Sequence, residues 1–367
     1  MSGGATSTDA PPPPPARRRS VWLAALLLVT AAVLLFSPLI GSITIPPFRV
    51  LEIVLSGGGA FFNPCAGAGP VCGREVIAVW QGRVPEVLLA VVAGAALGIS
   101  GGALQGIFRN PLADPYLLGI STGGTLGAAF VFVLNVGVTD ADLVLPLLAF
   151  TGSVLTGLAI LAVARGRYGS VETLLLTGVA LNAFLSSILT IVLLYNPVGS
   201  IQVTFWLLGG LGGASWTRDG IAFGGILVAG SLIAIYGREV NLLQLGNDVA
   251  QSAGVDARAV RTRILLLASL ATAVAVAFTG VIGFVGLAAP HVVRRVAGSD
   301  YRIVLPGAAV VGAAFLVAAR DGSYVFSYLA VGGGTVLPIG IFTSLAGAPF
   351  FFLLLYRRRR LTTMGAS

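Results

Sequence analysis

The side chains best suited to act on a ligand lie in one short polar stretch, FRNPLADPYLLGIST at residues 108–122, between two long apolar segments. The stretch combines Arg109, Asn110 and Asp114 with two prolines. Prolines interrupt a helix, and an asparagine side chain can bond the backbone groups left open at the resulting turn. A plain connection between helices needs fewer special residues. One interpretation is a functional constriction at the end of the molecule, and an ordinary turn is the alternative.

Several kinds of chemistry are excluded by the side chains that the chain lacks. All 22 basic residues are arginine, so no lysine is present for an ATP-binding P-loop or a retinal Schiff base. His291 is the single histidine, which excludes a metal site built from several histidines. Ser215, in GASWTRDG, has no histidine within reach to activate it. The chain is therefore not expected to be an enzyme or to bind a cofactor or metal itself.

Composition places the polar stretch in a membrane protein. The chain of 367 residues is 56% hydrophobic and 10% charged, with a mean hydropathy of +0.95. Soluble domains carry about 25% charged residues, so this chain cannot cover a soluble surface with charge. Apolar windows of about 20 residues recur along it, which is the pattern of membrane-spanning helices. We expect an all-α polytopic membrane protein.

Ten apolar windows predict ten spanning helices. Two of them are separated only by the glycine-rich segment TGVIGFVG, and the eighth is short. The predicted spans are residues 21–40, 84–107, 116–135, 143–164, 173–194, 219–236, 263–281, 282–293, 303–320 and 336–356. They divide the chain into a disordered cytoplasmic N-terminal tail at 1–20, a membrane domain at 21–357 and a cytoplasmic C-terminal tail at 358–367.

The arginines predict which loops are cytoplasmic. Ten spans put both termini on one side, and a cytoplasmic placement of that side leaves only five of the 22 arginines outside, as the positive-inside rule favours. Those five are Arg49, Arg74, Arg83, Arg218 and Arg320. The strong positive charge thus indicates topology in a cytoplasmic membrane rather than nucleic-acid binding. Cys65 and Cys72 fall in an external loop, where they form either a disulfide or two free thiols.

A stripe of glycines marks the second span as a packing helix. Gly94, Gly98, Gly102 and Gly106 are each four residues apart and therefore share one helix face. Small residues in such a stripe allow two backbones to approach closely in lipid. We expect this helix to lie near the centre of the bundle.

The longest cytoplasmic loop, GREVNLLQLGNDVAQSAGVDARAVRT at residues 237–262, has an ordered pattern. Gly246 and Gly254 divide it into short helices, with Asn247 or Asp248 as the cap of the second. Asp256 can cap the span that follows.

Leucines make this loop a candidate docking site. Leu242, Leu243 and Leu245 form an apolar patch, and exposed apolar residues on an ordered loop suggest a protein partner. A helix lying on the lipid surface is the alternative. Because the chain has no P-loop, a separate ATPase is the natural partner.

Four segments, in this order, resemble the FecCD-type permeases, the membrane subunits of ABC importers for iron-siderophores, haem and cobalamin. The segments are GRVPEVLLAVVAGAALGISGGALQGIFRNPLADPYLLGISTGG, NLLQLGNDVAQSAGV, GVIGFVGLAAPHVVRRVAGSDYRIVLPGAA and LPIGIFTSLAGAPFFFLLL. The resemblance covers residues 21–357 and implies a homodimer with ten helices per subunit, a path between the subunits and import by alternating access. An ion-coupled secondary transporter is the alternative, although Glu172 and Asp321 lie at span ends rather than at the midplane.

The resemblance also implies partners and site residues. Two cytoplasmic ATPase subunits would bind ATP and Mg²⁺, and an extracytoplasmic binding protein would deliver a metal chelate, with iron-siderophore the first expectation and cobalamin or haem next. The ATPase would dock on Asn241, Leu242, Leu245, Asp248, Val249, Ser252 and Gly254. A cytoplasmic gate would include Asn110, Leu112, Val171 and Glu172.

Two departures from the family pattern affect the external face. The family often carries R-x-P-R where this chain has Arg83-Val-Pro-Glu86, and Val325 stands where an arginine would follow Asp321. These arginines typically pair with acidic residues of the binding protein. The residues expected to dock the binding protein here are Arg74, Arg83, Arg320 and Asp321.

Overall fold

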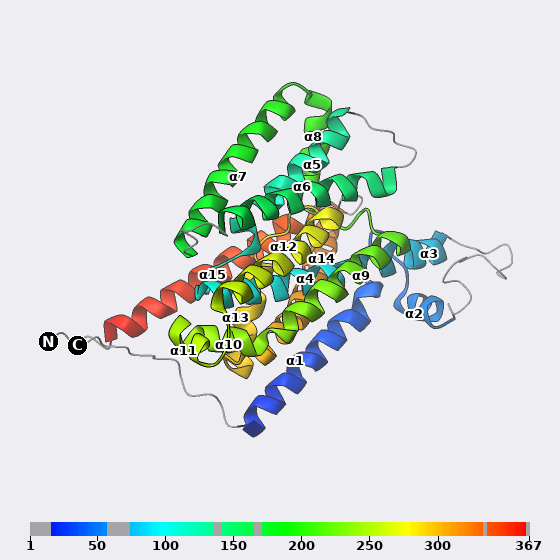
Figure 1. The fold of residues 1–367 in the computed structure, drawn as a ribbon. Coiled ribbons are helices and arrows are strands. Elements are labelled where there is room, and N and C mark those ends of the chain that lie inside the picture. Colours follow the sequence, from blue (N-terminus) through cyan, green and yellow to red (C-terminus); the bar gives the residue numbers. More distant parts are fainter. Residues whose placement is uncertain (1–15, 57–73, 135–140, 165–170, 333–335, 365–367) are drawn as a thin grey trace.

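The computed structural model describes residues 16–56, 74–134, 141–164, 171–332 and 336–364, and its regular elements there are helices (Figure 1). They are α1 (Ala16–Phe36), α2 (Pro47–Ser56), α3 (Arg74–Ile77), α4 (Val84–Phe108), α5 (Ile120–Leu134), α6 (Ala141–Ala164), α7 (Val171–Leu194), α8 (Pro197–Leu207), α9 (Trp216–Ile235), α10 (Gly237–Leu245), α11 (Asn247–Ser252), α12 (Ala257–Thr279), α13 (Val285–Ala297), α14 (Tyr301–Val331) and α15 (Ile339–Met364).

The ten predicted spans each correspond to a helix, namely α1, α4, α5, α6, α7, α9, α12, α13, α14 and α15. Within the described residues, seven helices are long and apolar enough to cross a membrane, and α5 and α15 contain shorter apolar segments. The all-α polytopic fold is thereby confirmed.

Several boundaries differ from the prediction. Helix α1 begins at Ala16, inside the predicted tail 1–20, and α15 extends to Met364, into the predicted tail at 358–367, because arginine is a good helix former. Helix α13 begins only at Val285, since Phe284 has the left-handed φ of 68° and breaks the chain from helical geometry. Short helices α2, α3 and α8 were not predicted, and Cys65 and Cys72 lie outside the described residues.

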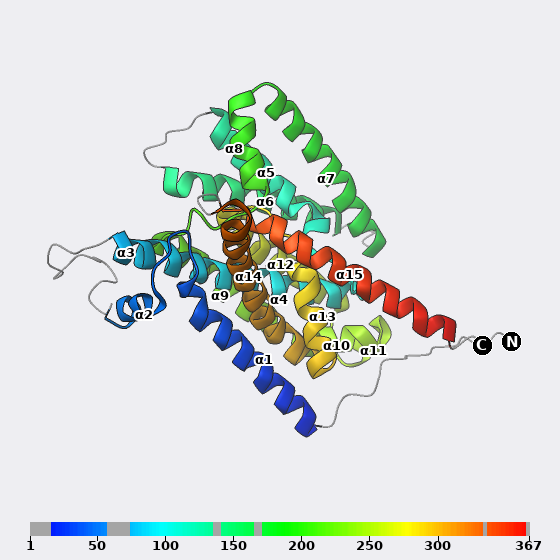
Figure 2. The same ribbon diagram turned by 180° about the vertical axis from the view of Figure 1, so that it is seen from behind.

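Helix α4 forms the centre of the molecule. It packs against α14, α12, α13 and α9, and 83% of its apolar window is buried, against 11% for α1 and for α7. Helices α5, α6, α7 and α8 form a second group that joins the first where α6 packs on α12 (Figures 1 and 2). The low burial of α7 leaves most of its length available to lipid or to another subunit.

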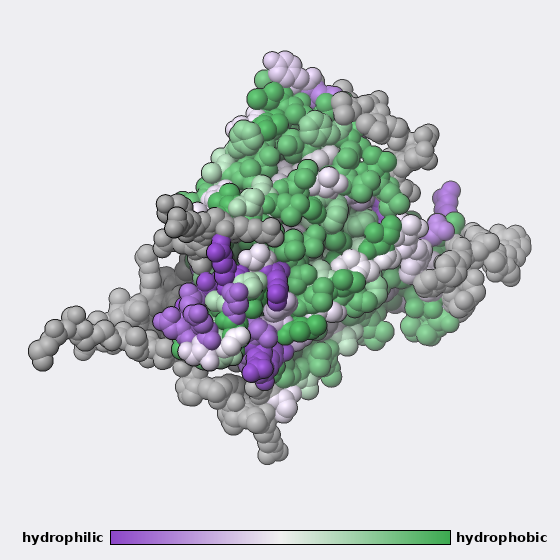
Figure 3. Space-filling model, in the orientation of Figure 1, coloured by the Kyte–Doolittle hydropathy of each residue, from purple (hydrophilic) through white to green (hydrophobic). Residues whose placement is uncertain are grey.

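The two ends of the bundle differ in character. Helices α10 and α11 lie at one end, which we call the α10–α11 end, and the first residues of α1 and the last residues of α15 lie toward the same side. Helices α2 and α3 lie at the opposite end, the α2–α3 end. Figure 3 shows hydrophilic residues gathered over α10 and α11, while the rest of the bundle on the face in view is largely apolar, as a membrane requires.

The contact between α4 and α14 is made by backbone. A Cβ added to Gly94 would collide with the carbonyl oxygen of Gly312, and one added to Gly98 would collide with that of Ala308. Close approach of this kind replaces the hydrophobic driving force that lipid-embedded helices lack. The two helices therefore lie together at a separation that only glycine allows.

The other two glycines of the stripe differ from each other. Gly106 lies against the side chains of Val240 and Tyr301, which leave no room for a Cβ. A Cβ at Gly102 would lie 3.5 Å from its nearest neighbour, a side-chain atom of Leu305, which is an ordinary contact. Gly102 thus provides a control on the same helix face.

We expect Gly98→Ala to lower the free energy of unfolding by about 1–3 kcal/mol, because the methyl group overpacks the α4–α14 contact. Gly102→Ala should leave stability unchanged or raise it slightly, since alanine favours a helix by about 1 kcal/mol. The unfolding midpoint of the purified protein in detergent measures both. Equal effects of the two substitutions would contradict the close contact.

Candidate functional site

The polar turn after α4 is rigid. Arg109 adopts the left-handed conformation, with φ 51°, and the N–H of Asn110 donates to the carbonyl of Gln105 at 3.2 Å, closing the end of the helix. The Asn110 side chain accepts from the N–H of Leu112 at 2.9 Å, which forms a side-chain turn. Leu112 is 42% exposed at the tip. This geometry fits a fixed projection rather than a loose connection.

Asp114 anchors the second half of the turn. Its carboxylate accepts from the N–H of Tyr116 at 2.8 Å and caps the 3-10 turn Pro115–Leu118. The hydroxyl of Tyr116 in turn accepts from the N–H of Ile282, in the break between α12 and α13. Desolvation of the buried carboxylate raises the pKa of Asp114 from 3.8 to about 6. The turn is therefore tied to the core through one buried acid and one tyrosine.

Val171 and Glu172, the other predicted gate residues, form the first turn of α7. Their side chains lie outside the described part of the structure. Helix α7 does pack against the 3-10 turn Pro115–Leu118, so its body adjoins the polar turn.

Helices α10 and α11 form the predicted two-helix loop. Gly246, with φ 128°, separates them, and Gly254, with φ 80°, follows the end of α11. Asp256 caps α12 by accepting from the N–H groups of Arg258 and Ala259, as predicted. Asn247 is not a cap, because it is the first residue of α11 and no side chain caps that helix.

The apolar patch of the loop differs from the prediction. Leu243 is fully buried and Leu242 is partly buried, because these side chains pack into the core under α10. Leu245, the last residue of α10, is 68% exposed, and Val249, in α11, is 45% exposed. Among the described residues of the loop, these two side chains form the exposed apolar surface.

Side chains hold the loop firmly on the bundle. The Asn241 amide donates to Asp300 at 2.7 Å and accepts from the N–H of Tyr301 at 2.9 Å, at the start of α14. The Gln244 amide donates to the carbonyl of Gly106, in the last turn of α4. The side chain of Asn241 therefore faces inward, while Asp248, Ser252 and Gly254 are exposed.

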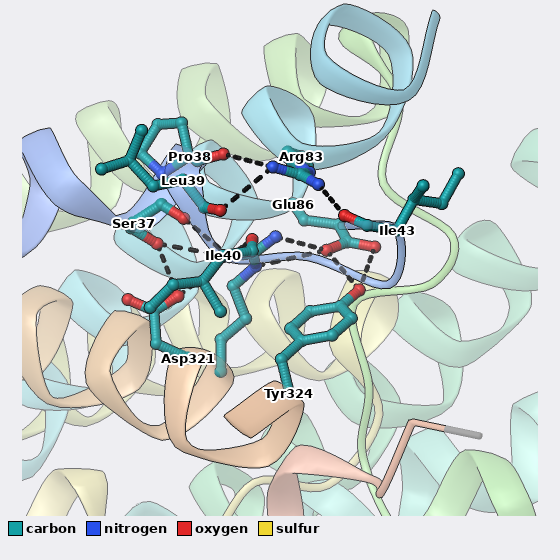
Figure 4. Close-up of polar contacts among 10 residues, drawn as sticks. Ser37, Pro38, Leu39, Ile40, Ile43, Arg83, Glu86, Asp321 and Tyr324 are labelled. Atoms are coloured by element: carbon teal, nitrogen blue, oxygen red, sulfur yellow. Dashed lines mark hydrogen bonds and ion pairs between the residues drawn. The ribbon is translucent and has the colours of Figure 1, made fainter. Parts of the chain in front are cut away.

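A polar network occupies the α2–α3 end (Figure 4). Arg320, 1% exposed, donates to Glu86 at 2.9 Å and to Asp321 at 2.9 Å. The nitrogen that donates to Asp321 also donates to the carbonyls of Ser37 and Ile40, after α1. Helix α4, helix α14 and the segment after α1 are thereby joined at one guanidinium.

Tyr324 and Arg83 complete the network. The Tyr324 hydroxyl donates to Glu86 at 2.8 Å, and its ring lies 4.7 Å from the Arg320 guanidinium carbon. Arg83 donates to the carbonyls of Pro38 and Leu39, both at 3.1 Å, and to that of Ile43 (Figure 4). A cavity of about 400 Å³ lies beside the network. Its lining includes Ser42, Arg74, Arg83, Glu86 and Tyr324.

The arginines predicted to dock the binding protein differ in exposure. Arg83 and Arg320 are buried, because each satisfies acceptors of its own chain. Glu86 explains the departure from the family pattern, since it supplies the anion that Arg320 needs in the interior. Arg74 is exposed at the cavity, and Asp321 is largely buried against Ser37. Sequence reasoning found the arginines but missed Glu86 and Tyr324 as their partners.

We expect Glu86→Ala to lower the free energy of unfolding by about 3–5 kcal/mol, because it leaves the buried Arg320 charge without its partner. The double substitution Glu86→Met with Arg320→Met should recover most of the loss. The control is Glu52→Ala, which removes an exposed ion pair to Arg49 and should cost less than about 1 kcal/mol. Denaturant unfolding in detergent tests all three, and a mild effect of Glu86→Ala would show that Arg320 does not depend on it.

Asp114 gives a pH dependence of defined sign. Its pKa is raised on folding, so its contribution to stability is present below about pH 4 and is lost as the pH rises through about 6. Asp114→Asn keeps an oxygen for the cap and removes the charge, so we expect a gain of up to about 3 kcal/mol at pH 7. Thermal unfolding from pH 4 to pH 7 should show a shallower fall for the variant. A parallel slope in both proteins would refute the assignment.

Comparison with known proteins agrees with these features. The profile of the FecCD transport family matches residues 27–357. The hemin transport system permease protein of Yersinia pestis is 39% identical over 286 residues, covering 76% of this chain and 82% of that protein. The cobalamin import system permease protein of Halobacterium salinarum is 38% identical over 281 residues, covering 75% and 72%.

A solved structure of a metal-chelate type ABC transporter in an inward-facing conformation has a similar fold. The TM-score is 0.75 at 27% identity, with 92% of this chain and 99% of that chain covered. The family profile spans nearly the whole membrane domain, and relatives above 30% identity cover three quarters of the chain. The chain therefore belongs to the FecCD transport family of ABC importer permeases.

Proposed function

We propose that two copies of this chain form the membrane path of an importer that carries a metal chelate into the cytoplasm. An iron-siderophore is the first candidate, and cobalamin or haem follows. The observation that carries the proposal is the α10–α11 loop, which is fixed to α4 and α14 yet exposes Leu245 and Val249. A rigid element with an exposed apolar surface suits a partner protein that binds the element and transmits its own motion to it. Family membership sets aside the ion-coupled alternative.

The partner on this loop would be an ATPase that binds ATP and Mg²⁺, because a permease subunit of this family does not hydrolyse ATP. Its docking surface would comprise Leu245, Asp248, Val249, Ser252 and Gly254. Asn241 and Leu242 would support this surface from below, since their side chains face the bundle. The α10–α11 end and both termini would then be cytoplasmic.

The path would run along α7, between the two copies. Large side chains such as Leu176, Phe184 and Ile191 are exposed on this helix, as a subunit contact requires. Hydroxyls and an amide also lie along it, and the Asn182 side chain bonds Thr122 of α5. Scattered polar groups of this kind suit a large chelate. Within the described residues, no group of three histidine, cysteine or acidic side chains is placed to hold a bare metal ion.

The gate would lie where the polar turn meets the start of α7, at Asn110, Leu112, Val171 and Glu172. Contact between α7 and the 3-10 turn Pro115–Leu118 supports this placement. The binding protein would dock at the α2–α3 end, where Arg74 is exposed beside the cavity. Because Arg83 and Arg320 are occupied internally, that contact would depend on shape more than on paired charge.

Co-purification tests the assembly directly. The tagged chain, extracted from its native membrane in mild detergent, should carry an ATPase subunit at equal abundance in a particle with two copies of each. Chelates that stimulate ATP hydrolysis by this particle would then identify the substrate class. A chain that purifies without an ATPase, even after crosslinking, would refute the proposal.

Gly254→Pro should abolish transport that depends on ATP. Gly254 has φ 80° and its N–H donates to the carbonyl of Gln251, so proline loses both the conformation and the hydrogen bond. Gly254→Asn is the matched control, because asparagine tolerates the left-handed region. Substrate uptake and ATPase binding should be lost for proline and kept for asparagine, and normal uptake by the proline variant would remove the loop from the mechanism.

A further inference from the structure

We propose that Asn247 is a positioning residue that couples the docking loop to the polar turn at the gate, by holding Arg109 and Arg261 on one amide oxygen. The inference rests on the proposed function, because it assigns how motion of the loop reaches the path. The sequence context of Asn247 predicts a helix cap, a role that the structure does not give it.

The contacts join three elements at one atom. The Asn247 side-chain oxygen accepts from the Arg261 guanidinium at 2.7 Å and from the Arg109 guanidinium at 3.3 Å. Asn247 begins α11, Arg109 opens the polar turn, and Arg261 lies near the start of α12. Any displacement of α11 must therefore move or break the contact that holds the turn.

Charge makes the loss of the contact unfavourable. Two guanidinium groups that share one acceptor repel each other, and a neutral amide offsets that repulsion only by hydrogen bonding. Withdrawal of Asn247 would leave Arg109 and Arg261 facing each other without this acceptor. The bridge is thus stable in one position of the loop and unfavourable once the loop moves, as a two-position coupling requires.

The backbone of Arg109 points to a use for its side chain. The position after α4 has φ 51°, which glycine adopts without cost and an ordinary side chain adopts at a cost. Arg109 is exposed, so its side chain gains nothing by filling the core. A strained residue at an exposed turn suggests a role in function, and the bond to Asn247 supplies that role.

A second hydrogen bond links the loop to the end of α4, beside the contact between Asn247 and Arg109. The Gln244 amide, on α10, donates to the carbonyl of Gly106, only three residues before Arg109. The last turn of α4 is therefore held from α10 and the polar turn from α11. Movement of the loop as one unit would act on both sides of the helix end at once.

The test uses the reconstituted importer, with its ATPase and binding protein, in proteoliposomes. The readout is the amount of chelate imported per ATP hydrolysed, measured beside the thermal unfolding midpoint. Asn247→Ala should lower import per ATP by about fivefold or more, in the range of typical coupling between sites. Asn247→Asp should keep it within about twofold, because a carboxylate accepts from both arginines.

Arg109→Gly separates coupling from folding. Glycine relieves the left-handed strain, so the unfolding midpoint should stay equal or rise while import per ATP falls as it does for Asn247→Ala. The double variant should be no worse than either single variant, since both remove the same contact. Arg263→Ala, which removes a nearby exposed arginine on α12, is the matched control and should behave as wild type.

Unchanged import per ATP in Asn247→Ala would overturn the bridge, and so would additive losses in the double variant. A fall in the unfolding midpoint of Arg109→Gly that matches its loss of import would show a structural role instead. Failure of the wild-type chain to assemble or import would instead refute the proposed function, so the two failures are distinguishable.

Discussion

The glycine-lined contact between α4 and α14 sets the register of the whole molecule. These helices run antiparallel, and Gly94 meets Gly312 while Gly98 meets Ala308. The same register brings Glu86 to Arg320 at one end and Gly106 to Tyr301 at the other. Because backbone meets backbone, neither helix can slide or turn without a collision. The network around Arg320 and the anchorage of the α10–α11 loop both depend on this one fit.

A rigid pair at the centre restricts where alternating access can occur. Helices α4 and α14 must move as one body, together with the network around Arg320 and the loop anchors on Asp300 and Gly106. The group α5–α8 meets this body through α6 on α12 and through the turn after α4. Under the proposed function, relative motion between the two groups, driven from α10 and α11, would open a path along α7. The polar turn lies at that junction, which explains its dense local bonding.

Much of this architecture could be predicted from local sequence. Each of the ten apolar windows predicted a helix that the structure contains, because the bilayer sets how long an apolar helix must be, and the spacing of Gly94 and Gly98 indicated a packing face. The cap by Asp256 followed from its position before a helix. Buried polar partners could not be predicted in this way. Arg320 finds Glu86 at a distance of 234 residues along the chain, and no local pattern links them.

The sequence also could not predict which side chains are buried at several sites. An arginine at the end of a span is compatible with an external or an internal position, and Arg83 turned inward because three carbonyls after α1 needed donors. Leu243 differs from Leu245 only in which side of a short helix it occupies, and that side is set by packing on the bundle. Asn247 lies in a cap-like sequence context, yet its side chain bonds Arg109, 138 residues away in the sequence, and Arg261 on the next helix.

The internal pairing of Arg320 bears on how a partner arrives at the α2–α3 end. Unpaired charges on a protein surface raise the association rate with an oppositely charged partner by long-range attraction, and added salt screens this attraction. Here Arg320 and Glu86 pair inside the protein, and the Arg83 guanidinium donates its hydrogen bonds to backbone carbonyls. Among the arginines predicted to dock the binding protein, Arg74 would then be the one left to attract it from a distance. The arrival rate would depend less on ionic strength than it would with three exposed arginines, so such an importer would lose little of its capture rate in saline surroundings.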